Sequence, residues 1–234
     1  MSPSGEDSSK LPPGYQVGEY RVSGFLRAED FGDVYAAEHV VLGRAAEVKF
    51  IWDASHQYYL AALPSVLLKG AKLLAGLNHP NVAAIESAGE IDGRTYVIRR
   101  AIAGTHLGEY VDRRTPSLEE GLRILDSVAA ALSYCHENGV IHQNLKPGTI
   151  FLNERNEPVL TDFTIAVQEG TCDNQEIRYI GTPGYMSPEQ WRKDPVTRAT
   201  DIWGFGAMAY FVFSAKTLPP SVEDTSSDWS RAAA

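Results

Sequence analysis

The hydrophobic pattern of this chain changes its period about halfway along the sequence. From Tyr20 to Phe50, short apolar runs alternate with polar turns, which predicts antiparallel strands. Ser117–Glu120 has the form of a capping box that opens a helix, and this helix should end at Asn138-Gly139. The apolar residues of the helix recur on one face: Leu118, Leu122, Leu125, Val128 and Leu132. The pattern therefore predicts a β-rich part followed by a helical part.

Further elements agree with this division. Residues 64–76 have the apolar spacing of a helix that Pro64 can open. Ala83–Ile85 and Thr95–Ile98 are predicted to be strands around the turn at Asp92-Gly93. Asp201–Phe213 is apolar nearly all round, which is typical of a buried helix.

Composition excludes several classes of function. The net charge of −9 and the lack of a basic run argue against a nucleic-acid partner, because phosphate backbones require clustered Lys and Arg. The longest apolar stretch, Ala207–Phe213, is far shorter than the roughly 20 residues that span a bilayer, so no membrane insertion is expected. The two cysteines, Cys135 and Cys172, lack metal-type spacing and favour a reducing, cytoplasmic setting.

Six segments occur in the order and spacing of a known family. Val140–Leu152 resembles the catalytic loop of the Hanks-type (eukaryotic-like) Ser/Thr protein kinases, and Leu160–Ala166 resembles their D-F-G turn. Gly181–Glu189 resembles the end of the activation segment in its bacterial form. The others resemble the lysine-bearing strand, the turn after a helix and the start of the buried central helix: Gly43–Lys49, Leu77–Val82 and Thr200–Gly206.

The resemblance implies an α+β fold of the bilobal protein-kinase-like form, with a small β-rich N-terminal lobe and a mostly helical, C-terminally shortened second lobe. The expected divisions are a disordered leader over residues 1–17, the first lobe over 18–101, the incomplete second lobe over 102–221 and a disordered tail over 222–234. The family's second lobe continues through three more helices, so the last helix here should expose apolar surface. Such a surface predicts a partner, self-association or poor stability.

The resemblance also locates the catalytic positions, in degenerate form. Asn144 stands where the family has the aspartate that orients the acceptor hydroxyl, and an amide cannot take a proton. Thr149 replaces a magnesium-binding asparagine, and its hydroxyl lacks the carbonyl oxygen that a hard cation prefers. Lys146 of the catalytic loop is retained, and so is Asp162, the other metal ligand.

The nucleotide-binding positions that the resemblance implies are Val34, Lys49 and Asp162. The glycine-rich loop before them is degraded, because Arg27 and Glu29 replace its first two glycines. Those glycines let backbone amides approach the phosphates closely, whereas Glu29 would bring a carboxylate near them.

Two partners of the catalytic residues are missing. The helix glutamate that pairs with Lys49 in the family falls on Gly70, so Lys49 needs another acid. A glycine in mid-helix also costs about 1 kcal/mol relative to alanine. Gln143 replaces the arginine that receives a phosphate on the activation segment, so switching by phosphorylation of that segment, for example at Thr182, is not expected.

The adenine pocket of the family is also altered. Glu47 shares a strand face with Lys49, because residues two apart on a strand point the same way. A buried, unpaired carboxylate costs several kcal/mol, so we expect Glu47 to pair with Arg99, Arg100 or Lys49. Together with the bulky Phe151, this pair would obstruct the nucleotide site. Alternatively, the arginines point to solvent and the site is merely empty.

These replacements predict a pseudokinase, which is a kinase-fold binding or regulatory module with little or no phosphoryl transfer and no cofactor. One alternative is a weak or atypical ATP-dependent Ser/Thr protein kinase that uses Lys49, with Asp162 holding magnesium. Another is an inactive remnant of a truncated kinase. A pseudokinase should have a protein partner, such as a signalling protein or an active kinase.

Overall fold

The computed structural model describes residues 10–52, 62–171 and 181–218, which separate into two compact units. The first unit combines Met1–Pro64 with Ile85–Ala101, and the second combines Ser65–Ala84 with Ile102–Ala234. The division after residue 101 coincides with the predicted one. Residues 65–84, however, belong to the second unit. Gly70 in their helix lies close to the Phe163 carbonyl oxygen, and Asn81 and Ala83 form backbone hydrogen bonds with Leu160.

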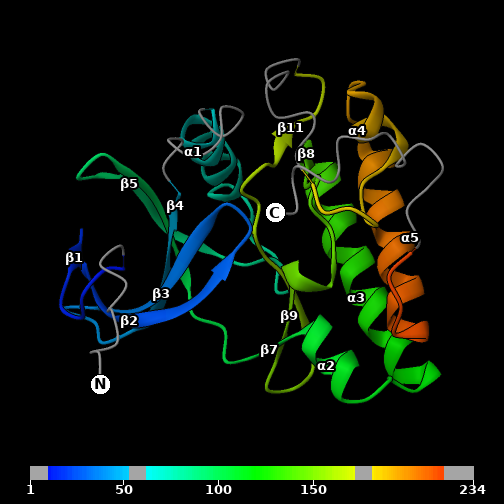
Figure 1. Cartoon of the computed structure of the whole chain (residues 1–234), viewed down its shortest axis with the longest axis horizontal. Coiled ribbons are helices and arrows are strands. Elements are labelled where there is room, and N and C mark those ends of the chain that lie inside the picture. The colour runs from blue at the N-terminus through cyan, green and yellow to red at the C-terminus, as the bar shows by residue number, and fades with distance from the viewer. Residues whose placement is uncertain (1–9, 53–61, 172–180, 219–234) are drawn as a thin grey trace, which may run out of the picture. The chain divides into compact units, whose positions relative to one another are not determined.

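The first unit is built on a six-stranded antiparallel sheet (Figure 1). Its spatial order is β1-β2-β3-β4-β6-β5, so β5 is an edge strand. The strands are β1 (Gln16–Val17), β2 (Tyr20–Glu29), β3 (Gly32–His39), β4 (Ala45–Ile51), β5 (Ile85–Ile91) and β6 (Arg94–Arg100). The strands predicted between residues 20 and 50 are therefore confirmed.

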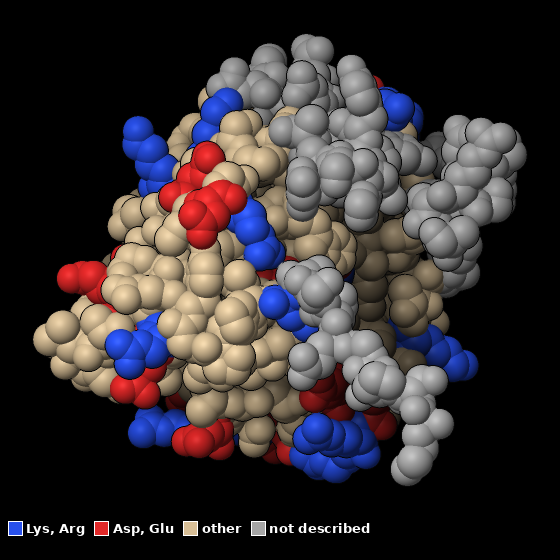
Figure 2. Space-filling model, turned by 60° about the vertical axis from the view of Figure 1, so that its left-hand side comes forward, with Lys and Arg blue, Asp and Glu red and all other residues tan. Residues whose placement is uncertain are grey.

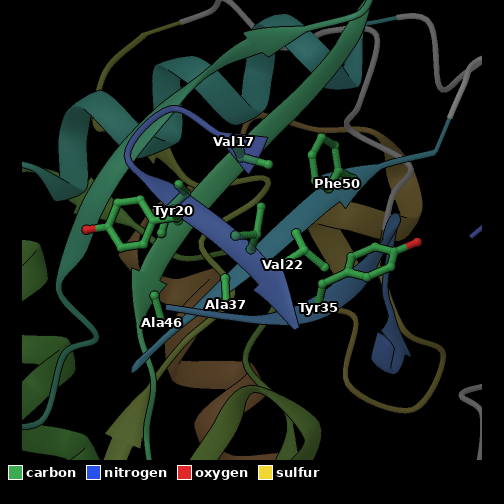
Figure 3. Close-up of a cluster of buried hydrophobic side chains, with 9 residues drawn as sticks. Val17, Tyr20, Val22, Tyr35, Ala37, Ala46 and Phe50 are labelled. Carbon is green, nitrogen blue, oxygen red and sulfur yellow. The ribbon is translucent and has the colours of Figure 1, made fainter. Parts of the chain in front are cut away.

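One face of this sheet carries an aromatic core. On β2, Tyr20 and Val22 are buried whereas Arg21 between them is exposed, which is the alternation expected of a strand with one covered face. Figure 3 shows Val22 beside Tyr35 in this cluster. The rings of Tyr35 and Phe50 meet edge to face, with centroids 6.1 Å apart, a favoured geometry for aromatic pairs.

The predicted leader is too long at its C-terminal end. Val17 of β1 is fully buried, and Leu11 and Tyr15 pack against the core cluster. These apolar residues stand singly in a stretch rich in Ser, Pro and Gly, so no periodic signal marked them. Residues 1–9 and 219–234 lie outside the described residues, and so does the expected tail.

The turn between β5 and β6 is confirmed, but the strand before it is displaced. Asp92 and Gly93 both have positive φ, as two-residue hairpin turns of this kind require. The predicted strand Ala83–Ile85 is replaced by β5, which starts at Ile85. Ala83 instead donates its N–H to the Leu160 carbonyl in the second unit, so a short apolar run was assigned to the wrong sheet.

The second unit is mostly helical, and α3 and α5 run side by side in it (Figure 1). Its helices are α1 (Leu63–Leu74, which starts just before the unit boundary), α2 (Leu107–Arg113), α3 (Leu118–Glu137), α4 (Pro188–Arg192), α5 (Arg198–Ser214) and a 3-10 turn (Pro147–Thr149). Two small antiparallel sheets, β10-β9-β7 and β11-β8, comprise β7 (Gly104–His106), β8 (Val140–Ile141), β9 (Ile150–Asn153), β10 (Pro158–Leu160) and β11 (Val167–Gln168).

Helix α3 confirms the capping box and the burial of Leu125, Val128 and Leu132, but two other residues of the predicted apolar face are exposed. Ser117 accepts the Glu120 N–H while the Glu120 carboxylate accepts the Ser117 N–H. Leu118 and Leu122 are 68% and 52% exposed. The buried face of α3 is instead rotated towards Gly121. A Cβ added to Gly121 would collide with the Phe213 ring of α5, so the close contact between the two helices requires a glycine here.

Helix α5 is only partly covered within the described residues. Its Met208 and Val212 are fully buried, whereas Ile202 and Trp203 are 59% and 42% exposed. The helix predicted to be buried all round therefore has one exposed apolar side, in agreement with the expected uncovered surface. Among the described residues, we find no helix with the length and apolar character needed to cross a membrane.

Candidate functional site

The first unit contains a buried pair between β4 and β6. Glu47 stands opposite Arg99 in the strand register. Arg99 donates from Nε and Nη2 to Glu47 Oε2, over 3.0 and 2.6 Å. Both residues are less than 9% exposed. The predicted ion pair between Glu47 and Arg99 is therefore present.

Three further charged side chains join this pair. Arg27 of β2 donates to both carboxylate oxygens of Glu47, at 3.2 and 2.8 Å, and also to Glu29 at 2.7 and 2.9 Å. Arg99 reaches Glu29 as well, at 3.2 Å. Lys49 lies with its Nζ 3.5 Å from Glu29 Oε2. We call these five residues, Arg27, Glu29, Glu47, Lys49 and Arg99, the charged cluster. Its three cations and two carboxylates leave one positive charge.

The charged cluster keeps Glu47 ionised despite its burial. Burial by itself would raise the pKa of Glu47, but the charges and hydrogen bonds of Arg99 and Arg27 outweigh it and lower the pKa below the ordinary value. Burial would likewise lower the pKa of Arg27, yet Glu47 and Glu29 raise it. Lys49 has Glu29 as the alternative acid that the sequence left open.

Other residues of the altered glycine-rich loop and hinge have structural roles. Gly32 follows the two replaced glycine positions of this loop, and a Cβ there would overlap the Phe50 carbonyl oxygen. Arg100 pairs with Glu86, at 3.0 and 3.1 Å, rather than with Glu47. Val34 is buried and stands between Arg27 and Lys49 in the register.

In the second unit, the loop after β8 is held by buried Asp201 of α5. Asp201 accepts the backbone N–H groups of His142 and Gln143 at 2.9 and 2.8 Å, and its Oδ2 lies 2.8 Å from His136 Nε2. Burial lowers the pKa of His142. Its Nδ1 accepts the Asn144 N–H, so Nε2 carries the proton and donates to the Thr161 carbonyl.

Asn144 and Asp162 face one another in this loop region. The Asn144 amide nitrogen lies 3.5 Å from Asp162 Oδ2, and the Thr164 hydroxyl donates to Asp162 Oδ1. Both oxygens of the carboxylate thus face neutral hydrogen-bond donors. Asp162 has a positive φ of 58°, a conformation in which aspartate is tolerated better than most residues.

Thr149 and Lys146 are engaged within the loop and the following segment. The Thr149 hydroxyl lies 3.0 Å from both the Asn144 and the Lys146 carbonyl oxygens, and it accepts the Lys146 N–H at 3.1 Å. Lys146 Nζ donates to the Thr182 hydroxyl at 2.7 Å. The hydroxyl of Thr149 therefore closes the loop on itself.

A family model described as "Protein kinase domain" matches residues 27–233, nearly the whole of the chain. The chain belongs to the protein kinase family. It is 28% identical over 223 residues to the serine/threonine-protein kinase PknB of Mycobacterium leprae, covering 91% of this chain and 35% of that protein. It is 26% identical to PrkC of Bacillus subtilis, covering 85% and 31%, and 30% identical to PknH of Mycobacterium bovis, covering 92% and 38%. The chain thus spans about a third of the length of these relatives.

Two kinase positions acquire a physical explanation from the structure. A Cβ on Gly70 of α1 would lie 2.6 Å from the Phe163 carbonyl oxygen, so this helix approaches the D-F-G-like turn too closely for a side chain. Gln143, at the kinase arginine position, donates from Nε2 to the Ile165 carbonyl at 2.7 Å, and its own carbonyl accepts from Gln190. The side chain and the backbone carbonyl of Gln143 therefore both form hydrogen bonds within the kinase fold.

Two other kinase residues also take part in local structure. Phe151 of β9 is buried, and its ring centroid lies 4.2 Å from that of His106. Glu189, in the segment that resembles A-P-E, accepts a hydrogen bond from the Thr200 hydroxyl at 2.6 Å.

Sequence reasoning missed two members of the charged cluster as ion-pair partners. Arg27 and Glu29 were identified only as replacements for glycines. Their period-two spacing on β2, with the same spacing of Glu47 and Lys49 on β4, was the available signal. The spacing alone does not show that these residues pair. They meet because the sheet order β2-β3-β4-β6 places their three strands near one another. Cys172 lies outside the described residues.

Proposed function

We propose that this member of the protein kinase family is a pseudokinase, a binding or regulatory module with little or no phosphoryl transfer. The single observation that carries the proposal is Asn144. Its side-chain amide nitrogen, a donor, faces Asp162, at the position where phosphoryl transfer requires a carboxylate to orient the acceptor hydroxyl. A positioned general base contributes about 10²–10⁴ in rate.

The residues present do not fit a magnesium ion well. Magnesium demands oxygen ligands in near-octahedral geometry, and an asparagine carbonyl would normally supply one. The Thr149 hydroxyl instead bonds to carbonyl groups of its own loop. Asp162 has Thr164 and Asn144 as donors to its two oxygens. In this proposal, neutral donors take over part of the role that the cation has in an active kinase.

The charged cluster supports the same proposal from the first unit. Lys49 lies next to Glu29 rather than next to a helix glutamate, and Gly70 cannot supply that acid. Glu47 occupies the strand face on which the family has an alanine against the base, and it is held there by Arg99 and Arg27. We propose that the charged cluster obstructs nucleotide binding, so that no cofactor is needed.

A direct test compares the natural chain with the double substitution Asn144→Asp plus Thr149→Asn. ATP and Mg²⁺ binding is measured by calorimetry and thermal shift, and phosphate transfer with radiolabelled ATP. We expect no micromolar nucleotide binding and no transfer by the natural chain. Robust, stoichiometric incorporation into a protein substrate, abolished by Lys49→Met, would sink the proposal and favour the alternative of a weak or atypical kinase.

We propose a protein partner and a cytoplasmic setting for this module. The chain's net charge of −9 and the scattering of Lys and Arg among Asp and Glu on the visible face (Figure 2) do not favour nucleic acid. Cys135 is buried, and burial raises the pKa of its thiol to about 12, so it is an inert structural residue rather than a disulfide candidate. Self-association through the exposed side of α5 is the second possibility for a partner.

A further inference from the structure

The turn between β3 and β4 exposes three consecutive apolar side chains. Val40, Val41 and Leu42 are 43%, 79% and 58% exposed. Their backbone is hydrogen-bonded to His39, whose Nδ1 accepts the N–H groups of Val41 and Leu42 at 3.3 and 3.4 Å. The Gly43 N–H also donates to the His39 carbonyl at 2.9 Å. A rigid run of exposed apolar residues is a feature of binding surfaces rather than of ordinary solvated turns.

A hollow of about 240 Å³ adjoins this turn, and it lies within the first unit. Arg44, the second residue after Leu42, forms part of its wall. The lining residues are Tyr20, Arg44, Ala45, Ala46, Glu86 and Arg100. Figure 3 shows the Tyr20 hydroxyl pointing away from the core cluster. The volume is below the roughly 300–1,000 Å³ of pockets for small-molecule ligands, so it suits a single side chain.

The residues that line the hollow include two arginines, Arg44 and Arg100, and one carboxylate, Glu86. Arg100 donates from Nε and Nη2 to the same oxygen of Glu86, at 3.1 and 3.0 Å. The second Glu86 oxygen lies 3.8 Å from Arg44 Nη2, which is too long for a hydrogen bond. Arg44 is half-exposed. Its planar guanidinium can therefore take a further carboxylate in a bidentate pair, which is the geometry that guanidinium groups favour.

We propose that the turn Val40–Leu42 and the adjoining hollow bind an extended acidic segment of a partner protein. An apolar side chain of the partner packs on Val41 and Leu42, and a neighbouring Glu or Asp enters the hollow. Its carboxylate pairs with Arg44, while its aliphatic stem lies on Ala45 and Ala46. The held turn reduces the entropy lost on binding, because these residues are already ordered.

Charge favours a polypeptide over other occupants. The chain has a net charge of −9, so an anionic membrane or a nucleic acid would be repelled by most of the molecule. An acidic side chain on a short peptide meets the local positive charge without bringing a large anionic surface. This binding surface is separate from the charged cluster, and it does not depend on the loss of phosphoryl transfer.

The test begins with selection of random 12-residue peptides displayed on phage against the purified chain. We expect a consensus with Asp or Glu within three residues of a large apolar residue. The consensus peptide, labelled with fluorescein, is then titrated by anisotropy against the natural chain and its variants. Arg44→Glu should weaken binding at least tenfold, and Val41→Ser should weaken it about fivefold. A peptide with the acid changed to Lys should regain affinity for the Arg44→Glu variant.

Arg21→Glu is the matched control, because it makes the same charge change on the opposite face of β2 from Tyr20. It should leave the affinity within twofold, and circular dichroism should show that all variants are folded. The proposal is overturned if no acidic consensus emerges, or if Arg44→Glu and Arg21→Glu weaken binding equally. It is also overturned if Val41→Ser abolishes sedimentation with phosphatidylserine vesicles, or if Arg44→Glu abolishes self-association seen by ultracentrifugation, because the surface then serves a membrane or a second copy.

Discussion

Replacing Gly70 by alanine sets two opposing energies against each other. In the interior of a helix, alanine is favoured over glycine by about 1 kcal/mol, so propensity alone predicts a more stable protein. The new Cβ, however, would lie 2.6 Å from the Phe163 carbonyl oxygen, whereas real Cβ atoms essentially never approach closer than 3.0 Å. The obstacle is backbone, so either α1 or the turn must retreat.

Overpacking of this kind costs about 1–3 kcal/mol, which equals or exceeds the gain from propensity. We therefore expect Gly70→Ala to be neutral or to lower the free energy of unfolding by up to about 2 kcal/mol. Gly206→Ala on α5 is the matched control, since Gly206 is exposed and an added Cβ there would meet no atom within 4 Å. That variant should gain about 1 kcal/mol.

The two variants are compared by urea unfolding followed by circular dichroism, at the same pH and protein concentration. The reasoning predicts a difference of about 1–3 kcal/mol between them, with Gly206→Ala the more stable. If Gly70→Ala stabilises the protein as much as Gly206→Ala does, the close approach of α1 to the turn is refuted. Gly70→Glu, which restores the acid of the family, should destabilise further and should not restore phosphate transfer.

Three other results are expected. Glu47→Ala should lower the free energy of unfolding by about 3–5 kcal/mol, because Arg99 and Arg27 lose their shared buried carboxylate and only Glu29 is left among the three cations of the charged cluster. In the same urea titration, Glu38→Ala on the exposed surface of β3 should change the free energy of unfolding by less than about 0.5 kcal/mol. The pKa of Glu47 is lower in the folded state than in the unfolded state. The ionised carboxylate therefore contributes its full stabilisation above the unfolded pKa of about 4.3, and this stabilisation is lost as the pH falls through the folded pKa. The urea midpoint of the Glu47→Gln variant should consequently decline less steeply with falling pH than that of the natural chain. In the Cys172→Ser variant, Cys135 should not react with a thiol reagent at pH 8 until urea unfolds the protein. Full reaction of Cys135 in the native protein would contradict the burial of this thiol and its pKa of about 12.

The assignment of Asn144 and Thr149 to catalytic positions stays a prediction, and it rests on local chemistry. An amide at Asn144 and a hydroxyl at Thr149 have the same donors and acceptors in any fold, so motif spacing alone is enough to predict what they replace. The capping box of α3 was equally visible, because its two bonds join residues three apart. The exposure of Leu118 and Leu122 was not visible, since the covered side of α3 depends on where α5 lies.

The sequence by itself determined the family and the antiparallel strands of the first unit, because both depend on residue type and short-range spacing. Only the tertiary structure decided which charges meet. Arg27 and Glu47 are 20 residues apart and pair through the register of three strands. The tertiary structure also explains Gly70. By helix propensity a glycine in mid-helix is unfavourable, but here it leaves the space that the Phe163 carbonyl oxygen occupies.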